Sequence, residues 1–149
     1  MKTIRTAGAV VAALMTATAL SACASVPMAS DDADIQAKRF QPPPAGQATL
    51  YVFREGMLSA GMAVNASVGQ RTLGQLGADS YFRVDVQPSD YDMRCGATEN
   101  SSSTTVSIAT GETRFVEIAT RFARCTILEV TEQQGRSAIA HGKRAAEIR

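Results

Sequence analysis

The chain has little of what catalysis and nucleic-acid binding require. Its 149 residues include one histidine, His141, so a serine or cysteine nucleophile has this single imidazole as its candidate base. His141 stands beside Gly142 near the C-terminus, where we expect it to be a solvated surface residue. The chain carries 15 lysines and arginines against 14 aspartates and glutamates, and the two signs are interspersed. Without the basic stripe that phosphate neutralisation needs, we expect no nucleic-acid partner.

The sequence also lacks a hydrophobic run typical of a spanning helix. Residues 7–20 are small or apolar without a charge, whereas a spanning helix needs about 20 apolar residues. Lys2 and Arg5 precede this run, and residues 1–5 contain no acidic side chain. A basic start followed by a short apolar run is typical of an export signal. A buried core helix is the alternative that a run of this length leaves open.

The run ends at Leu20-Ser21-Ala22-Cys23, which resembles the lipobox of bacterial lipoproteins. The resemblance implies that residues 1–22 are a cleaved signal peptide and that Cys23 carries a diacylglyceryl group on its sulfur and an acyl chain, such as palmitate, on its amine. Each buried methylene contributes about 0.8 kcal/mol, so three chains anchor firmly. Ala24 stands where many lipoproteins retained at the inner membrane have aspartate. We therefore expect the membrane as a partner, at the periplasmic face of the outer membrane.

Two further cysteines, Cys95 and Cys125, remain once Cys23 is set aside. Export places them where disulfides form and persist, and the sequence therefore predicts a bridge between them. The alternative is two unpaired thiols that act as small buried hydrophobes. The two residues are far apart in sequence and no histidine flanks them, so we expect neither a metal nor a cofactor.

Residues 23–46 are predicted to be a lipidated N-terminus followed by a tether. The composition turns polar and then reaches Pro42-Pro43-Pro44, which favours an extended, semi-rigid spacer. Within it, Ser30 or Asp31 could cap a short helix that the prolines end, although the segment is equally compatible with no helix. The aspartates of this segment are interpreted as a solvated charge run beside the helix start: Asp31, Asp32 and Asp34.

The central part of the chain has the two-residue period of β-strands. Its runs are rich in β-branched and aromatic residues, turn residues separate them, and no helix of crossover length intervenes. The polar run at 99–103 is predicted to be a loop, and 88–90 a turn. This pattern predicts a mostly β fold, a small antiparallel β-sandwich of seven to eight strands. The predicted strands are 48–54, 62–68, 71–76, 80–86, 91–95, 104–110, 113–122 and 124–130.

A short helix is predicted after the last strand. Thr131 and Gln134 have the spacing of a capping box, and Gly135 should weaken the helix by up to about 1 kcal/mol relative to alanine. The sandwich with this helix is assigned to residues 47–142. Residues 143–149 are expected to form a frayed tail.

The order of these features resembles a group of bacterial envelope lipoproteins whose domain has no assigned function, built on a sandwich related to the PEGA and transthyretin-like modules. The resemblance covers residues 42 to about 140. It implies a fold and an envelope location, and it supplies no catalytic residues. Ser89 stands where the family usually has glycine. The matching segments are 42–54, 68–76, 80–84, Pro88, 110–116, 129–130 and Gly135.

Other clusters could carry chemistry, and each has a structural alternative. Asp90 and Asp92 alternate on one predicted strand, so they point to one side and could hold calcium or serve as an acid/base pair; the alternative is a polar turn beside an edge strand. Arg114, Arg121 and Arg124 could line a patch for an acidic partner or form the wet face of a sheet. Three glycines lack the residues that complete a P-loop and are interpreted as hairpin and bulge positions: Gly69, Gly74 and Gly77.

The leading hypothesis is therefore a lipid-anchored, non-enzymatic sandwich that binds an envelope protein or peptidoglycan. One alternative is a protein acting on a small ligand, glycan or lipid with Asp90 and Asp92. A purely structural spacer is a third possibility, which would need no exposed apolar patch or long exposed edge.

Overall fold

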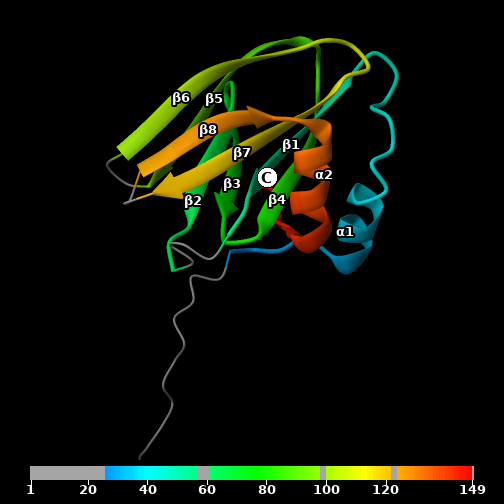
Figure 1. The fold of residues 1–149 in the computed structure, drawn as a ribbon. Helices are drawn as coiled ribbons and strands as arrows, with labels where there is room; N and C mark the ends of the chain where they lie inside the picture. Colours follow the sequence, from blue (N-terminus) through cyan, green and yellow to red (C-terminus); the bar gives the residue numbers. More distant parts are fainter. Residues whose placement is uncertain (1–25, 57–60, 98–99, 122–123, 149) are drawn as a thin grey trace, which may run out of the picture.

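A computed structural model describes residues 26–56, 61–97, 100–121 and 124–148, and these form a two-layer β-sandwich (Figure 1). The predicted signal peptide, Cys23 and Ala24 lie outside the described residues. One sheet has the order β8-β7-β1-β4-β9 and the other the order β3-β2-β5-β6. In the five-stranded sheet the strands are β1 (Ala48–Arg54), β4 (Ser80–Val86), β7 (Thr113–Arg121), β8 (Arg124–Val130) and β9 (Lys143–Arg144). In the four-stranded sheet they are β2 (Val64–Val68), β3 (Arg71–Leu76), β5 (Ser89–Ala97) and β6 (Asn100–Ile108).

The mostly β sandwich with a short helix near its C-terminal end is confirmed, and several strands have the predicted bounds. Two local predictions are wrong. Ser89 and Asp90 belong to β5 and not to a turn, and residues 100–103 belong to β6 and not to a loop. Each continues the antiparallel register between β5 and β6, so backbone pairing overrides the polar composition of these residues.

The pairing is not wholly antiparallel. β1 pairs with β7 in parallel, and β4 pairs in parallel with β9. A parallel pair needs a long crossover. Between β1 and β7 the chain enters the opposite sheet twice, as β2–β3 and as β5–β6, and β4 returns to the first sheet between these two visits. Antiparallel order was the expectation because no crossover helix was visible. A crossover made of strands gives no such signal.

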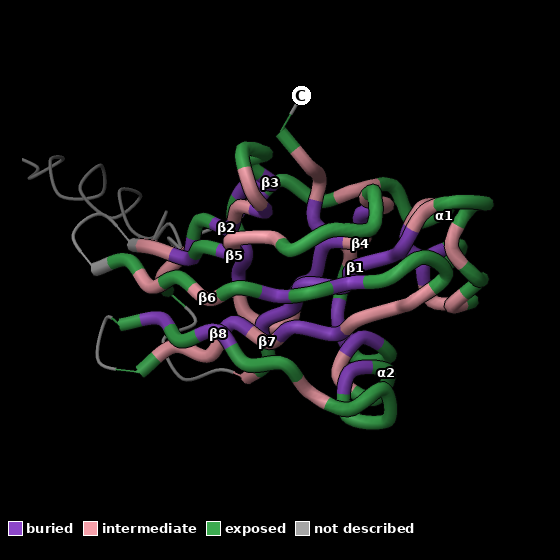
Figure 2. Tube along the Cα trace, turned by 90° about the horizontal axis from the view of Figure 1, so that it is seen from above, coloured by how far each residue is buried: buried purple, intermediate pink, exposed green. Residues whose placement is uncertain are grey.

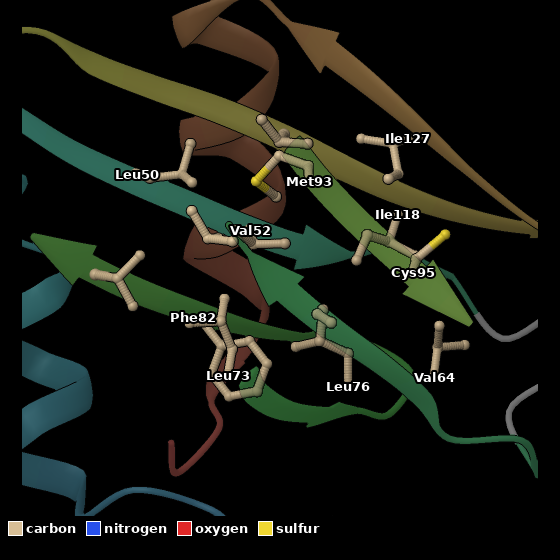
Figure 3. Packing of buried hydrophobic residues seen from close by; sticks show 14 of the residues in the cluster. Leu50, Val52, Val64, Leu73, Leu76, Phe82, Met93, Cys95, Ile118 and Ile127 are labelled. Atoms are coloured by element: carbon tan, nitrogen blue, oxygen red, sulfur yellow. The ribbon is translucent and has the colours of Figure 1, made fainter. Parts of the chain in front are cut away.

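The main core lies between the two sheets. Strand alternation points Leu50 and Val52 of β1 inward, where they meet Met93 of β5 and Leu73 of β3 (Figure 3). These side chains are fully or almost fully buried, and each removes apolar surface from water at about 25 cal/mol per Å². Cys95 and Cys125 belong to the same cluster and form a disulfide with a Cα–Cα distance of 6.2 Å, as the sequence predicts.

Two short helices cover the outer face of the five-stranded sheet. They are α1 (Asp31–Ala37), capped by Ser30, and α2 (Glu132–His141), whose capping box at Thr131 and Gln134 is formed as predicted. Neither helix of the described residues is long and apolar enough to cross a membrane. A second buried cluster lies beneath them and consists of Ala37, Tyr51, Phe53, Tyr81, Phe115 and Ile139.

The structure corrects the expected spacer and tail, because both pack against the sandwich. Residues 26–29 run beside residues 144–146, with Ala29 N donating to Arg144 O and Ala146 N donating to Pro27 O, both at 2.9 Å. Residues 143–144 form β9, and Ile148 N donates to Leu73 O of β3. These residues are held against the sandwich by backbone hydrogen bonds, which do not depend on side-chain composition and so could not be predicted from it. The proline run of the expected spacer lies between α1 and β1.

Both long sides of the sandwich are consequently closed. On the side of β9 and β3, the paired segments 26–29 and 144–148 join the two sheets. On the side of β8 and β6, the disulfide joins β5 to β8, and Ser102 Oγ donates to Cys125 O at 2.7 Å. Figure 2 shows the last described residues beside β3, across the molecule from β8 and α2.

Reduction of the disulfide is expected to destabilise the fold. The bridge closes a loop of 30 residues, and its loss should lower the free energy of unfolding by about 3–4 kcal/mol in the chain-entropy model. Urea denaturation with and without a reductant measures the change. A Cys95→Ala/Cys125→Ala double variant is the control and should not respond to the reductant. Equal stability of the wild type in both conditions would contradict the prediction.

Gly135 should be required by packing, despite its poor helix propensity. A Cβ at this position would lie 2.3–2.5 Å from Cγ, Cδ1 and Cβ of Phe115, and these atoms are at the fixed end of a buried ring. Gly135→Ala is therefore expected to lower the free energy of unfolding by about 1–3 kcal/mol, the usual effect of overpacking. Ser137→Ala, on the exposed side of the same helix, should change it by less than about 0.5 kcal/mol. Stabilisation of Gly135→Ala in urea denaturation would refute this assignment.

Candidate functional site: the uncovered face of the four-stranded sheet

The outer face of the four-stranded sheet is a polar surface that the fold leaves open. Both helices pack on the five-stranded sheet, and within the described ranges no helix lies over β2, β5 or β6 (Figure 1). A sheet with one buried and one wet face alternates along each strand. On β5, Met93 and Cys95 are buried, so Asp90, Asp92 and Arg94 point outward.

The neighbouring strands extend this face with short hydroxyl and amide side chains. Asp92 lies opposite Thr105 on β6, and Arg94 lies between Ser103 on β6 and Ser67 on β2. Short polar side chains leave backbone and hydroxyl groups accessible over a flat area. This surface is called the open face below; its residues are Asn65, Ser67, Thr72, Asp90, Asp92, Arg94, Gly96, Ser101, Ser103, Thr105 and Ser107.

A shallow depression of about 450 Å³ crosses the open face near Gly96. Gly96 contributes no side chain, Arg94 lies on its rim, and Asn65 and Ser101 flank it on the adjacent strands. Most of its exposed lining is apolar, and the amide of Asn65, the hydroxyl groups of Ser67, Thr72 and Ser101 and the guanidinium of Arg94 supply hydrogen-bonding groups around it.

Asp90 and Asp92 share the open face, as the alternation predicts, but they do not form a convergent pair. Arg94 Nε and Nη2 donate to Asp92 Oδ2 at 2.9 and 2.6 Å, so this carboxylate is already engaged. Asp90 is exposed and lines a separate depression of about 500 Å³ with Glu112 and Arg114. The described part of the chain contains no group of three or more His, Cys, Asp or Glu side chains arranged to hold a metal ion.

The remaining predicted candidates lie apart from one another. Arg114 and Arg121 are seven positions apart on β7, which corresponds to about 23 Å along a strand. Arg114 contacts Glu112 and Glu129, whereas Arg121 is opposite Arg124 at the far end of the β7–β8 pair. The three arginines therefore do not form one patch. His141 is exposed at the end of α2, with Nδ1 2.9 Å from Ser137 O.

The interpretation of Asp34 as part of a solvated charge run is wrong, because Asp34 is 5% exposed and joins three segments of the chain. Its Oδ1 accepts hydrogen bonds from Tyr81 OH at 2.7 Å and from Arg144 N at 2.8 Å, and its Oδ2 accepts one from Lys38 Nζ at 2.9 Å. Lys38 Nζ also donates to Gly142 O at 2.7 Å. The carboxylate thus connects α1, β4 and β9. The only signal in the sequence was the helical position of Asp34, three residues before Ala37 on the buried side.

The titration behaviour of this cluster follows from its contacts. Burial raises the pKa of Asp34, but the hydrogen bonds from Lys38, Tyr81 and Arg144 N lower it by more, so the pKa lies below the ordinary 3.8. Burial raises the pKa of Tyr81, and the hydrogen bond to the Asp34 carboxylate raises it further. Asp34 is therefore ionised and Tyr81 neutral at neutral pH, which is the state that the observed hydrogen bonds require.

Comparison with known proteins gives one distant relative and no family. No family model matches the chain. An uncharacterized protein of Haemophilus influenzae is 25% identical over 125 residues, which cover 81% of this chain and 74% of that protein. The similarity extends across most of the chain, and the relative carries no described activity.

Asp34→Asn is expected to lower the free energy of unfolding at pH 7 by about 1–3 kcal/mol, because charge-assisted hydrogen bonds are lost. Since the folded-state pKa is depressed, the contribution of Asp34 is complete above its unfolded pKa, near about 4, and disappears as the pH falls through the folded value. The difference from the wild type should thus shrink between about pH 5 and pH 2. Urea denaturation across this range measures it, with Asp32→Asn, exposed on the same helix, as the control. A difference that is independent of pH would show that the charge of Asp34 is unimportant.

Proposed function

We propose that the protein is a lipid-anchored, non-enzymatic interaction module of the bacterial envelope, held at the periplasmic face of the outer membrane. The N-terminal pattern supports the anchor through its resemblance to a lipobox that ends at Cys23. The Cys95–Cys125 disulfide agrees with an oxidising compartment outside the cytosol. The resemblance to envelope lipoproteins with a PEGA-like sandwich points the same way and is part of the proposal.

The open face carries the proposal of an interaction role. One sheet is covered by helices and the other is left wet, so a single flat surface of hydroxyl, amide and paired charged groups is available to a partner. Such groups bind by hydrogen bonds, which suits a peptide chain or a glycan such as peptidoglycan. The closed sides of the sandwich hold the face rigid, so little conformational entropy is lost on binding.

We do not propose a hydrolase that uses Asp90 and Asp92. General acid/base pairs need carboxylates in environments that separate their pKa values, and such environments are normally buried. Asp92 is 43% exposed at its side chain and is held by Arg94, while Asp90 is exposed. Neither residue has the surroundings that this chemistry requires.

Cell fractionation tests the anchor. The wild type should sediment with outer-membrane vesicles and show the added mass of the lipid, whereas Cys23→Ser should move to the soluble periplasmic fraction, because an unlipidated chain lacks the acyl groups that bind the bilayer. Sedimentation of both proteins with the membranes would contradict the proposed anchor.

Chemical crosslinking in intact cells tests the open face. Thr105→Arg places a long side chain in the middle of this face, and recovery of crosslinked envelope protein or peptidoglycan should fall at least about five-fold. Thr126→Arg is the matched control, because Thr126 is equally exposed on β8 but belongs to the opposite sheet. An equal loss in both variants, or in neither, would rule out the open face as the contact surface.

A further inference from the structure

We propose that the sandwich rests directly on the lipid headgroups, with the side formed by residues 26–29, residues 144–148 and β3 turned toward the bilayer. This inference rests on the proposed function, because it takes Cys23 as the lipid anchor. It adds an orientation and a second, non-covalent contact with the membrane. The partner is the headgroup layer of a phospholipid bilayer.

The first step is that the chain is fixed to the domain from Val26 onward. Val26 is 6% exposed and packs against Gly77. A Cβ added to Gly77 would lie 3.4 Å from Cγ2 of Val26. Met28 pairs with Ala145 in an antiparallel bridge. These contacts place the start of the described chain on the side of β3 and β9.

The second step concerns the length of chain that remains. Three residue steps separate Cys23 from Val26, and a fully extended chain covers at most about 3.6 Å per residue, which gives about 11 Å. The headgroup layer of one leaflet is about 5–8 Å thick. A lipidated Cys23 therefore holds Val26 within a few ångströms of the outer limit of the headgroups. The proline run does not lengthen the connection between Cys23 and the domain, because it follows α1 and is part of the domain.

The third step is the chemistry of the side that this short connection turns toward the lipid. Met28 is 50% exposed and Ile148 is 61% exposed, and Ile148 Cγ1 approaches Gly74 of β3. Single exposed hydrophobic side chains are common on protein surfaces, so the position of these two beside the short connection to Cys23, and not their exposure alone, supports a contact with the lipid. The described chain has four exposed large hydrophobic residues, which are Met28, Ile35, Leu128 and Ile148. The short connection to Cys23 places Met28 and Ile148 beside the anchor.

The charges on this side are compatible with a headgroup layer. Glu147 is paired with both Arg71 and Arg144, and Asp31 is paired with Lys143. The cations of these pairs outnumber the carboxylates, so zwitterionic or anionic headgroups meet no net negative field from them. Apolar contact next to a covalent anchor is thus not opposed by repulsion.

Tryptophan fluorescence provides the test, because the chain contains no tryptophan. Met28→Trp and Leu128→Trp each introduce a single probe at an exposed hydrophobic position, and β8, which carries Leu128, is at the opposite end of its sheet from β9. The full lipidated protein is incorporated into vesicles of phosphatidylethanolamine and phosphatidylglycerol that contain a lipid spin-labelled near the headgroup. Quenching of Met28→Trp should exceed that of Leu128→Trp several-fold. Ile148→Trp is a second proximal probe and should behave as Met28→Trp does.

A spacer insertion separates the effect of proximity from that of the anchor itself. About 12 Gly and Ser residues inserted between Ser25 and Val26 allow an excursion of roughly 20 Å. Flotation with the vesicles should be unchanged, and quenching of the proximal probes should fall toward the distal value.

The outcomes separate this inference from the proposed function. If Cys23 carries no lipid by intact mass and the protein does not float with vesicles, the proposed function fails and this inference fails with it. If the protein is lipidated and floats, but proximal and distal probes are quenched equally, only the orientation is overturned. Stronger quenching of Leu128→Trp would turn the opposite side of the sandwich toward the lipid and would likewise overturn it.

Discussion

The carboxylate of Asp34 is the buried charge at which the first helix of the domain, strand β4 and the last strand β9 meet. It accepts hydrogen bonds from a lysine of its own helix segment, a tyrosine of β4 and the backbone of β9. A buried charge is stable only when it is paired and hydrogen-bonded, so these three segments have to meet at one point. Other contacts of α1 with the sandwich are the packing of Ala37, the hydrogen bond from Tyr51 OH to Ala37 O, that from Arg144 Nη1 to Ala33 O, and the exposed ion pair between Asp31 and Lys143. One of these partners, Arg144, also belongs to the side that we propose to face the lipid.

The strands and helices could largely be predicted from the sequence because they depend on local patterns. The period of two in 48–54 and 80–86 and the capping box at Thr131 were sufficient for β1, β4 and α2. The parallel pairing of β1 with β7 could not be predicted, since it depends on a return through the other sheet. The places of residues 26–29 and 143–148 were missed for a similar reason, because backbone contacts between residues far apart in the sequence fix them.

The candidate surface was partly visible in the sequence. Alternation alone puts Asp90 and Asp92 on one face, and the structure keeps them there. The sequence could not show that Arg94 donates hydrogen bonds to the carboxylate of Asp92. It also could not show that both helices pack on the opposite sheet and leave this face exposed to solvent. Those facts favour a binding surface over a catalytic pair. The resemblance suggested an envelope module, and the open face is the physical reason to retain an interaction role for it.

The pairing of residues 26–29 with residues 144–146 also constrains the order in which the domain folds. These contacts join the first described segment to nearly the last one, so the connecting chain must collapse before they can form. Until residues 143–148 are in place, residues 26–29 lack the backbone hydrogen bonds that they make with them, and β4 lacks its neighbour β9. A folding intermediate in which residues 143–148 are not yet docked therefore has one side of its sandwich unsealed.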